Sequence, residues 1–66
     1  MPYVTSTAIE WVDYDASRQI MLIRFRSGPV TYSYYGVPRH VYEGFLNARS
    51  KGEYFHNQIE PFYSVG

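Results

Sequence analysis

The chain is short, rich in aromatic residues and electrically balanced. Of its 66 residues 20% are Phe, Trp or Tyr, and six basic side chains offset six acidic ones. We expect one domain over residues 1–66, because a chain of this length cannot hold two cores. The lack of cysteine excludes disulfides and thiolate metal sites, and the zero net charge argues against a protein that coats nucleic acid through its overall field.

The sequence shows neither a membrane span nor an export signal. Its longest uninterrupted apolar run, residues 20–23, is far shorter than the roughly 20 residues that a spanning helix needs. Residues 1–5 lack the basic and apolar stretches of a signal peptide. We therefore expect a cytoplasmic location.

Strands are predicted in the first half of the chain, over residues 8–14, 19–26 and 30–35. In the first of them the apolar alternation changes phase between Trp11 and Val12, which a β-bulge or a strand apolar on both faces would explain. Polar residues 15–18 and the Ser-Gly-Pro stretch at 27–29 are typical of turns. Such short connections predict an antiparallel meander.

The alternation within these strands predicts a core face and an open face. We expect the Tyr-Ser-Tyr stretch at 32–34 to serve core packing, because large rings supply most of the buried area in so small a domain. The predicted core face holds Met21, Ile23, Phe25, Tyr32 and Tyr34, with Val30 on the same side. The predicted open face holds Leu22, Arg24, Arg26, Thr31, Ser33 and Tyr35, together with Trp11.

Two short helices are predicted in the second half of the chain. Pro38 suits the first position of a helix whose apolar stripe is Val41, Tyr42, Phe45 and Ala48. Residues 50–53 match the capping box S-x-x-E, which predicts a second helix through residue 59, stopped by Pro61. The predicted fold is therefore α+β: a three-stranded antiparallel meander followed by two short helices on one face.

Several motifs together give a resemblance to a known family. They are Tyr14-Asp15, Met21-x-Ile23-x-Phe25, Ser27-Gly28, Tyr32-x-Tyr34, Gly36-Val37-Pro38, Val41-Tyr42 and Ser50-Lys51-Gly52-x-Tyr54-Phe55. In this order they resemble the KTSC domain, named for the C-terminal extension of some lysyl-tRNA synthetases and also found alone in small bacterial and phage proteins. Asp13 departs from the glycine that the family pattern has there. The resemblance implies RNA binding only by analogy with the synthetase.

The predicted open face is the first candidate binding surface. Bases can stack on the rings of Trp11 and Tyr35 while the guanidinium groups of Arg24 and Arg26 contact phosphate. The alternative is a protein partner or a homo-oligomer seam, because an exposed apolar patch formed by Trp11, Ile20 and Leu22 is typical of such contacts.

The start of the second predicted helix is the other candidate. Free amides at a helix N-terminus, with Arg49 and Lys51 beside them, can hold a phosphate or a nucleotide-like anion. The alternative is a plain helix cap with a solvated lysine, because Glu53 occupies one amide and adds a negative charge.

Catalytic, cofactor and metal sites are not predicted. The pairs His40–Glu43 and His56–Glu60 lie on separate predicted helices, whereas a metal site needs at least three converging ligands. The sequence therefore predicts a non-catalytic binding module for RNA, DNA or a nucleotide-like anion. The alternative is a protein–protein or self-association module with no nucleic-acid role.

Overall fold

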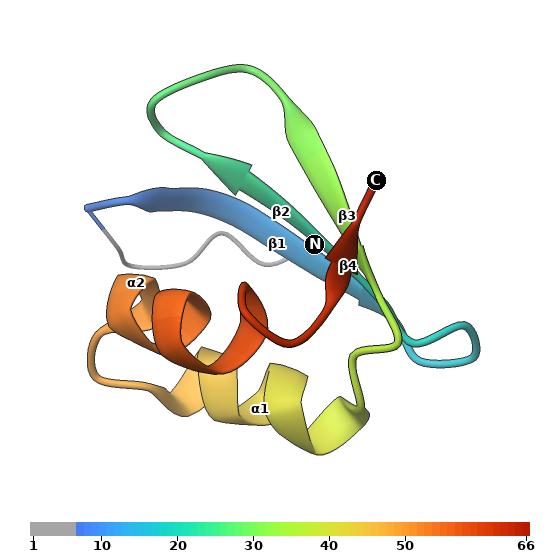
Figure 1. Cartoon of the computed structure of the whole chain (residues 1–66). Helices are drawn as coiled ribbons and strands as arrows, with labels where there is room; N and C mark the ends of the chain where they lie inside the picture. The colour runs from blue at the N-terminus through green and yellow to red at the C-terminus, as the bar shows by residue number, and fades with distance from the viewer. Residues whose placement is uncertain (1–6) are drawn as a thin grey trace.

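The structure is a computed structural model that describes residues 7–66, so the prediction made for residues 1–5 lies outside the described residues. A twisted antiparallel sheet forms one layer and a short helical layer packs on one of its faces (Figure 1). The predicted α+β class is confirmed. None of the helices within residues 7–66 has the length and apolar character that crossing a membrane requires.

The three predicted strands form the meander. The first is shifted by one residue, the second is one residue shorter at each end, and the third begins one residue later. They are β1 (Ile9–Asp15), β2 (Ile20–Phe25) and β3 (Thr31–Tyr35). The register between β1 and β2 shifts between Ile9 and Trp11, which confirms a bulge in this strand but places it before Trp11, not between Trp11 and Val12 as predicted. Because a bulge inserts one extra residue, both Ile9 and Val12 reach the core and are fully buried.

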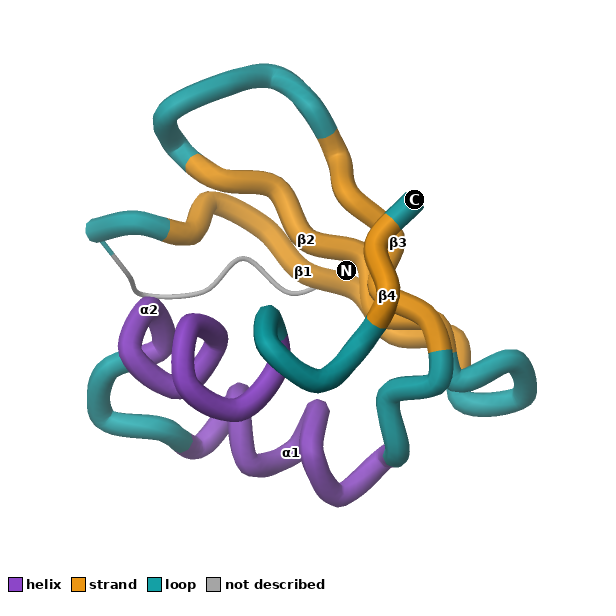
Figure 2. Tube along the Cα trace, in the orientation of Figure 1, coloured by secondary structure: helices purple, strands orange, loops and turns teal. Residues whose placement is uncertain are grey.

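A fourth strand was not predicted. The last residues of the chain return to the sheet as β4 (Ser64–Val65), giving the order β1-β2-β3-β4 (Figure 2). Two residues are too few to show an alternating pattern, and so the sequence carries no signal for this strand.

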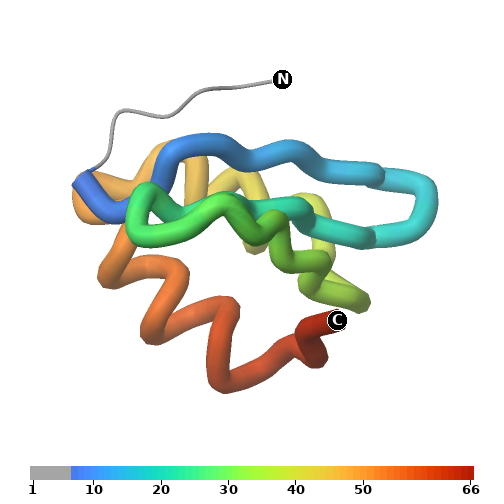
Figure 3. The backbone as a smooth tube through the Cα atoms, turned by 90° about the horizontal axis from the view of Figure 1, so that it is seen from above, coloured from blue at the N-terminus to red at the C-terminus, as the bar shows by residue number. Residues whose placement is uncertain are grey.

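The helical layer consists of α1 (Arg39–Asn47), α2 (Lys51–Tyr54) and the π-helix η1 (Phe55–Ile59). Pro38 is the N-cap of α1 in extended conformation, so its predicted place at the first helical position is wrong by one residue. The predicted cap at Ser50 is confirmed, since its hydroxyl accepts from the Glu53 amide at 3.3 Å. Figure 3 shows α2 and η1 running along the β3 side of the sheet.

The core lies between the sheet and the helical layer. Its buried members are Ile9, Val12, Met21, Ile23, Tyr34, Val37, Phe45, Phe55 and Ile59. The Phe55 ring packs edge-on against the rings of Phe25 and Tyr34, with centroids 5.2 and 5.3 Å apart. Tyr32 was predicted in this core but is 39% exposed, and only its tilted contact with Phe25 at 5.9 Å joins it to the cluster. Tyr32 is the second residue of β3, at the end of the strand that the helices do not cover.

The junction between sheet and helices is built from residues that carry the family resemblance. Gly36 has φ +76°, a conformation that L side chains rarely adopt, and it turns the chain so that Val37 is fully buried. The Tyr14 hydroxyl donates to the Val37 carbonyl at 2.6 Å, and the Tyr14 ring stacks on Tyr42 at 4.6 Å. Burial raises the pKa of Tyr14 above its ordinary value. This polar link ties β1 to the start of the helical layer.

Candidate functional site

On the face of the sheet away from the helices, the strand pairing arranges the side chains in three rows that cross the strands. Side chains paired across antiparallel strands point to the same face, so each row is a line of neighbours. The first row is Trp11, Arg24 and Thr31; the second is Asp13, Leu22 and Ser33; the third is Asp15, Ile20, Tyr35 and Ser64. No helix or strand within residues 7–66 covers this open face (Figure 1).

Arg24 is held in place by its neighbours on this face. Its guanidinium donates to the Thr31 hydroxyl at 3.0 and 3.1 Å and lies over the Trp11 ring, 5.6 Å from the centroid. A weak ion pair of 4.0 Å joins it to Glu10. The predicted direction of Arg24, away from the core, is confirmed, but its charge already has a carboxylate partner.

Acidic residues also lie on the open face, where the prediction from sequence placed none. The bulge in β1 puts Glu10 beside Trp11, so its carboxylate reaches Arg24 instead of lying on the other face. Asp13 and Asp15 follow in the second and third rows. Glu10 and Asp13 therefore offset the positive charge that was assigned to this face, whereas Asp15 forms an ion pair with Arg18 at 3.9 Å. The alternation of a strand already puts Asp13 and Asp15 on the face of Trp11, whereas the place of Glu10 depends on the bulge.

An apolar band crosses the open face diagonally. It consists of Trp11, Leu22, Ile20 and Tyr35, where Leu22 and Ile20 are neighbours on β2 and Ile20 pairs with Tyr35. Tyr35 is 47% exposed and the other three are half-buried. Any side chain at Gly66 would meet the Tyr35 ring, so that ring leans over Gly66, the residue after β4. We call these four residues the diagonal band.

The other predicted cationic residues do not converge with Arg24. Arg26 is exposed at the turn after β2, while Arg49 is exposed in the loop between α1 and α2. The Lys51 ammonium donates to the Ala48 carbonyl at 3.3 Å and so helps to end α1. The four cations thus lie on two sides of the molecule, and Lys51 has a structural contact where a phosphate was predicted.

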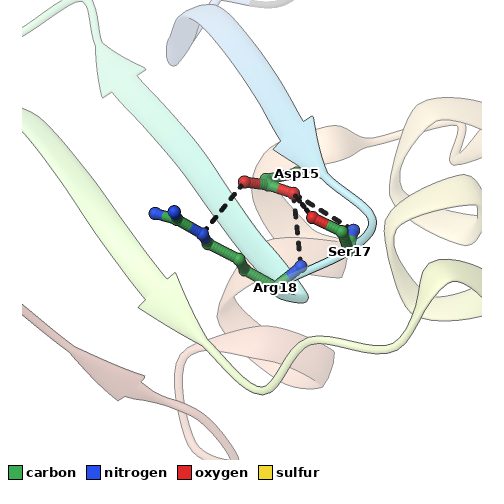
Figure 4. A network of polar contacts seen from close by, with 3 residues as sticks. All are labelled: Asp15, Ser17 and Arg18. Atoms are coloured by element: carbon green, nitrogen blue, oxygen red, sulfur yellow. Dashed lines mark hydrogen bonds and ion pairs between the residues drawn. The ribbon is translucent and has the colours of Figure 1, made fainter.

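The turn between β1 and β2 has a compact polar network. One oxygen of the Asp15 carboxylate accepts from the Ser17 hydroxyl at 2.8 Å and from the amides of Ser17 and Arg18 at 3.1 and 3.2 Å (Figure 4). These donors, led by the Ser17 hydroxyl, lower the pKa of Asp15 below its ordinary value. Such a carboxylate is a turn-forming group, typical of Asp at this position.

The two histidines lie apart from the open face. His56 lies 2.9 Å from a carboxylate oxygen of Glu60 on the exposed side of η1, and His40 is exposed on α1. Within residues 7–66 no three His, Cys, Asp or Glu side chains gather as metal ligands would.

The motif residues that carry the family resemblance are mostly structural. Gly36, Val37 and Tyr14 form the junction described above, and Phe55 is in the core. The Tyr54 hydroxyl donates to the Val41 carbonyl at 3.0 Å and lies against Gly44, where no side chain would fit. The motifs therefore describe a scaffold and say little about a ligand.

Comparison with known proteins agrees with this scaffold. The family model of the KTSC domain matches residues 5–63. A protein of Tsukamurella paurometabola is 41% identical over 61 residues, covering 92% of this chain and 90% of its own. A lysine–tRNA ligase of Trichormus variabilis is 45% identical over 47 residues, 71% of this chain but 8% of the ligase.

A solved structure extends the comparison to three dimensions. The crystal structure of a KTSC domain protein from Yersinia pestis superposes with a TM-score of 0.92 at 32% identity, covering 98% of this chain and 90% of the other. The fold, the motifs and these relatives agree, and the chain belongs to the KTSC domain family.

Proposed function

We propose that this KTSC domain is a non-catalytic binding module whose open sheet face docks onto a protein. The diagonal band carries this proposal. It combines Trp and Tyr with two aliphatic side chains and leaves polar groups at its margins, which is the composition of a protein–protein interface with an apolar centre and a polar rim.

The charge arrangement favours a protein over a nucleic acid on this face. Glu10, which pairs with Arg24, and Asp13 in the next row would both repel a phosphate brought close to Arg24. A protein surface with basic and apolar side chains meets no such repulsion, because its cations complement the acidic strand and its apolar groups cover the band.

The non-catalytic part of the proposal rests on what the titratable groups are doing. The Asp15 carboxylate holds a turn, the Lys51 ammonium bonds the last turn of α1, and His56 pairs with Glu60 where both side chains are exposed. None of these groups faces a nucleophile together with a third orienting group, the arrangement that general base catalysis requires.

The test begins with a photo-crosslinking amino acid at position 22, at the centre of the diagonal band. The captured protein is then purified and its affinity measured by calorimetry against wild type, Leu22→Lys and Asn47→Lys. Lysine at 22 faces Asp13 across the strands, so it keeps the sheet while charging the band.

We expect Leu22→Lys to weaken binding by at least about tenfold, and Asn47→Lys, on the exposed end of α1, to bind like wild type. Equal affinity of all three proteins would overturn the proposal.

RNA is the second candidate, favoured by one observation: part of a lysine–tRNA ligase matches this chain. Under this alternative, single-stranded RNA binds the rings of Trp11 and Tyr35 and loses affinity steeply as salt rises. Fluorescence anisotropy with short RNA at low and moderate salt tests it. Binding that disappears in an Arg24→Ala, Arg26→Ala double variant would favour RNA and displace the protein partner.

A further inference from the structure

The strongly exposed large apolar side chains of residues 7–66 gather at one edge of the sheet. They belong to β3, the residue before it, and the segment that leads into β4. They are Val30, Tyr32, Tyr35, Phe62 and Val65. Val65, 52% exposed, belongs to the edge strand itself, and Phe62, 69% exposed, lies in the turn just before it. Natural sheets normally protect such an edge with charges or cover it, so an uncovered apolar edge indicates a partner.

The hydrogen-bond pattern leaves an open donor and acceptor on this edge. Gly66 and Ser33 exchange two backbone bonds of 2.9 and 3.4 Å, so they form a bonded pair. Tyr34 and Val65 are the next pair along the ladder and are therefore a non-bonded pair. The amide and carbonyl of Val65 consequently point outward, away from β3.

The charges at this edge are compatible with a second copy of the same chain. Neither β3 nor residues 61–66 contain a charged side chain, whereas β1 and β2 carry four. No charged side chains are therefore brought together when two such edges meet, and no side chain there would select a charged partner. The outward amide and carbonyl of Val65 are also self-complementary. In two antiparallel copies related by a two-fold axis, each Val65 amide can donate to the Val65 carbonyl of the other copy.

We infer that β4 is a homodimerisation edge, in which Val65 of one protomer pairs antiparallel with Val65 of its partner. The two sheets then form one continuous sheet of eight strands. A two-fold axis perpendicular to the sheet keeps both helical layers on one side, where Phe62 and Val65 of the two copies approach each other. Because the described strand is only two residues long, the buried area falls well below the roughly 1,600 Å² of a standard interface. The dimer is therefore weak, with a dissociation constant on the order of 0.1 mM.

The dimer has a consequence for the diagonal band. Both open faces lie on the same side of the joined sheet, and each band ends at Tyr35 beside β4. Dimerisation would thus join two bands near the axis and offer a bivalent surface. This consequence rests on the proposed function, but the dimer itself does not.

Sedimentation equilibrium over about a hundredfold range of protein concentration tests the inference. We expect the average mass of the wild type to rise towards that of a dimer. Val65→Pro removes the outward amide, which the monomer does not use, and edge strands tolerate proline at such a position. Val65→Lys adds a charge at the axis and covers the case in which proline disturbs β4. We expect both variants to stay monomeric, with dissociation constants at least about tenfold higher.

A matched control is present in the chain itself. Val30 is 53% exposed, nearly the same as Val65, but it precedes β3 and lies three residues from Ser33, the last position that pairs with the C-terminal segment. Val30→Lys should associate like wild type. A wild type that stays monomeric throughout, or Val65 variants that still associate, would overturn the inference. So would loss of association in Trp11→Glu alone, which would place the seam on the open face.

Discussion

The two faces of the sheet carry different kinds of residue and have different tasks. Among residues 7–66, the helix side holds nine buried apolar or aromatic residues and the polar link from Tyr14 to Val37. The open side carries charges, hydroxyls and the diagonal band, all reachable by solvent. In a chain of 66 residues one face is enough for a core. The family motifs therefore specify the first face, and the proposed protein partner would contact the second.

The largest expected contrast lies between two neighbours on β2. Met21 is fully buried on the helix side and Leu22 is half-buried on the open side. Met21→Lys buries an unpaired charge and should lower the free energy of unfolding by more than about 4 kcal/mol, enough to unfold most of the protein. Leu22→Lys should cost no more than about 1 kcal/mol. Urea titrations followed by circular dichroism measure both, and similar losses would erase the distinction between the faces.

The helical layer gives the next contrast, between two glycines. A methyl group at Gly44 would collide with the Tyr54 hydroxyl, whereas one at Gly28 would meet nothing within 4 Å. We expect Gly44→Ala to destabilise the protein by about 1–3 kcal/mol, the usual cost of overpacking. Gly28→Ala should change stability by less than about 0.5 kcal/mol. Thermal unfolding measures both changes. A Gly44→Ala variant as stable as wild type would contradict the close contact between Gly44 of α1 and the Tyr54 hydroxyl of α2.

Two tyrosines sharpen the comparison further. Removing the hydroxyl in Tyr14→Phe leaves the Val37 carbonyl without its donor and should cost about 1 kcal/mol. Tyr35→Phe, on the open face, serves as the control, and we expect it to be neutral. Chemical denaturation gives the free energy of unfolding of both variants. A larger loss of stability in Tyr35→Phe than in Tyr14→Phe would contradict the account.

The smallest effect concerns pH and the turn that lies between the faces. Hydrogen bonds led by the Ser17 hydroxyl lower the pKa of Asp15 in the folded state. A lowered folded pKa means that this stabilisation is present above the unfolded value of 3.8 and is lost as pH falls through the lower folded value. Carboxyl titration by NMR should show this low pKa, and Ser17→Ala should raise it. An unchanged Asp15 titration in that variant would refute the assigned cause.

Much of the fold could be predicted from sequence because its signals are local. The alternation in residues 20–25 and the cap at Ser50 each depend on a few neighbouring residues, and both are confirmed. Two features could not be predicted. The edge strand β4 has only two residues, and the exposure of Tyr32 depends on where the helices end, which no local pattern encodes.

The candidate site was predicted only in part for a related reason. Trp11, Arg24 and Tyr35 do share the open face, because strand parity follows directly from sequence. Which charges offset Arg24 depends on the exact position of the bulge, and that position is fixed by packing of Ile9 and Val12 in the core. Arg49 and Lys51 were predicted as a separate anion site at the start of the second helix, where the Lys51 ammonium instead donates to the Ala48 carbonyl.

Methyl NMR of adjacent residues in β2 tests the central claim most directly. In a titration with the protein captured at position 22, the methyl signals of Ile20 and Leu22 report on the open face, and those of Met21 and Ile23 on the helix side. The account predicts large shifts for Ile20 and Leu22 and little change for the other two. Shifts concentrated on Met21 and Ile23 would contradict it.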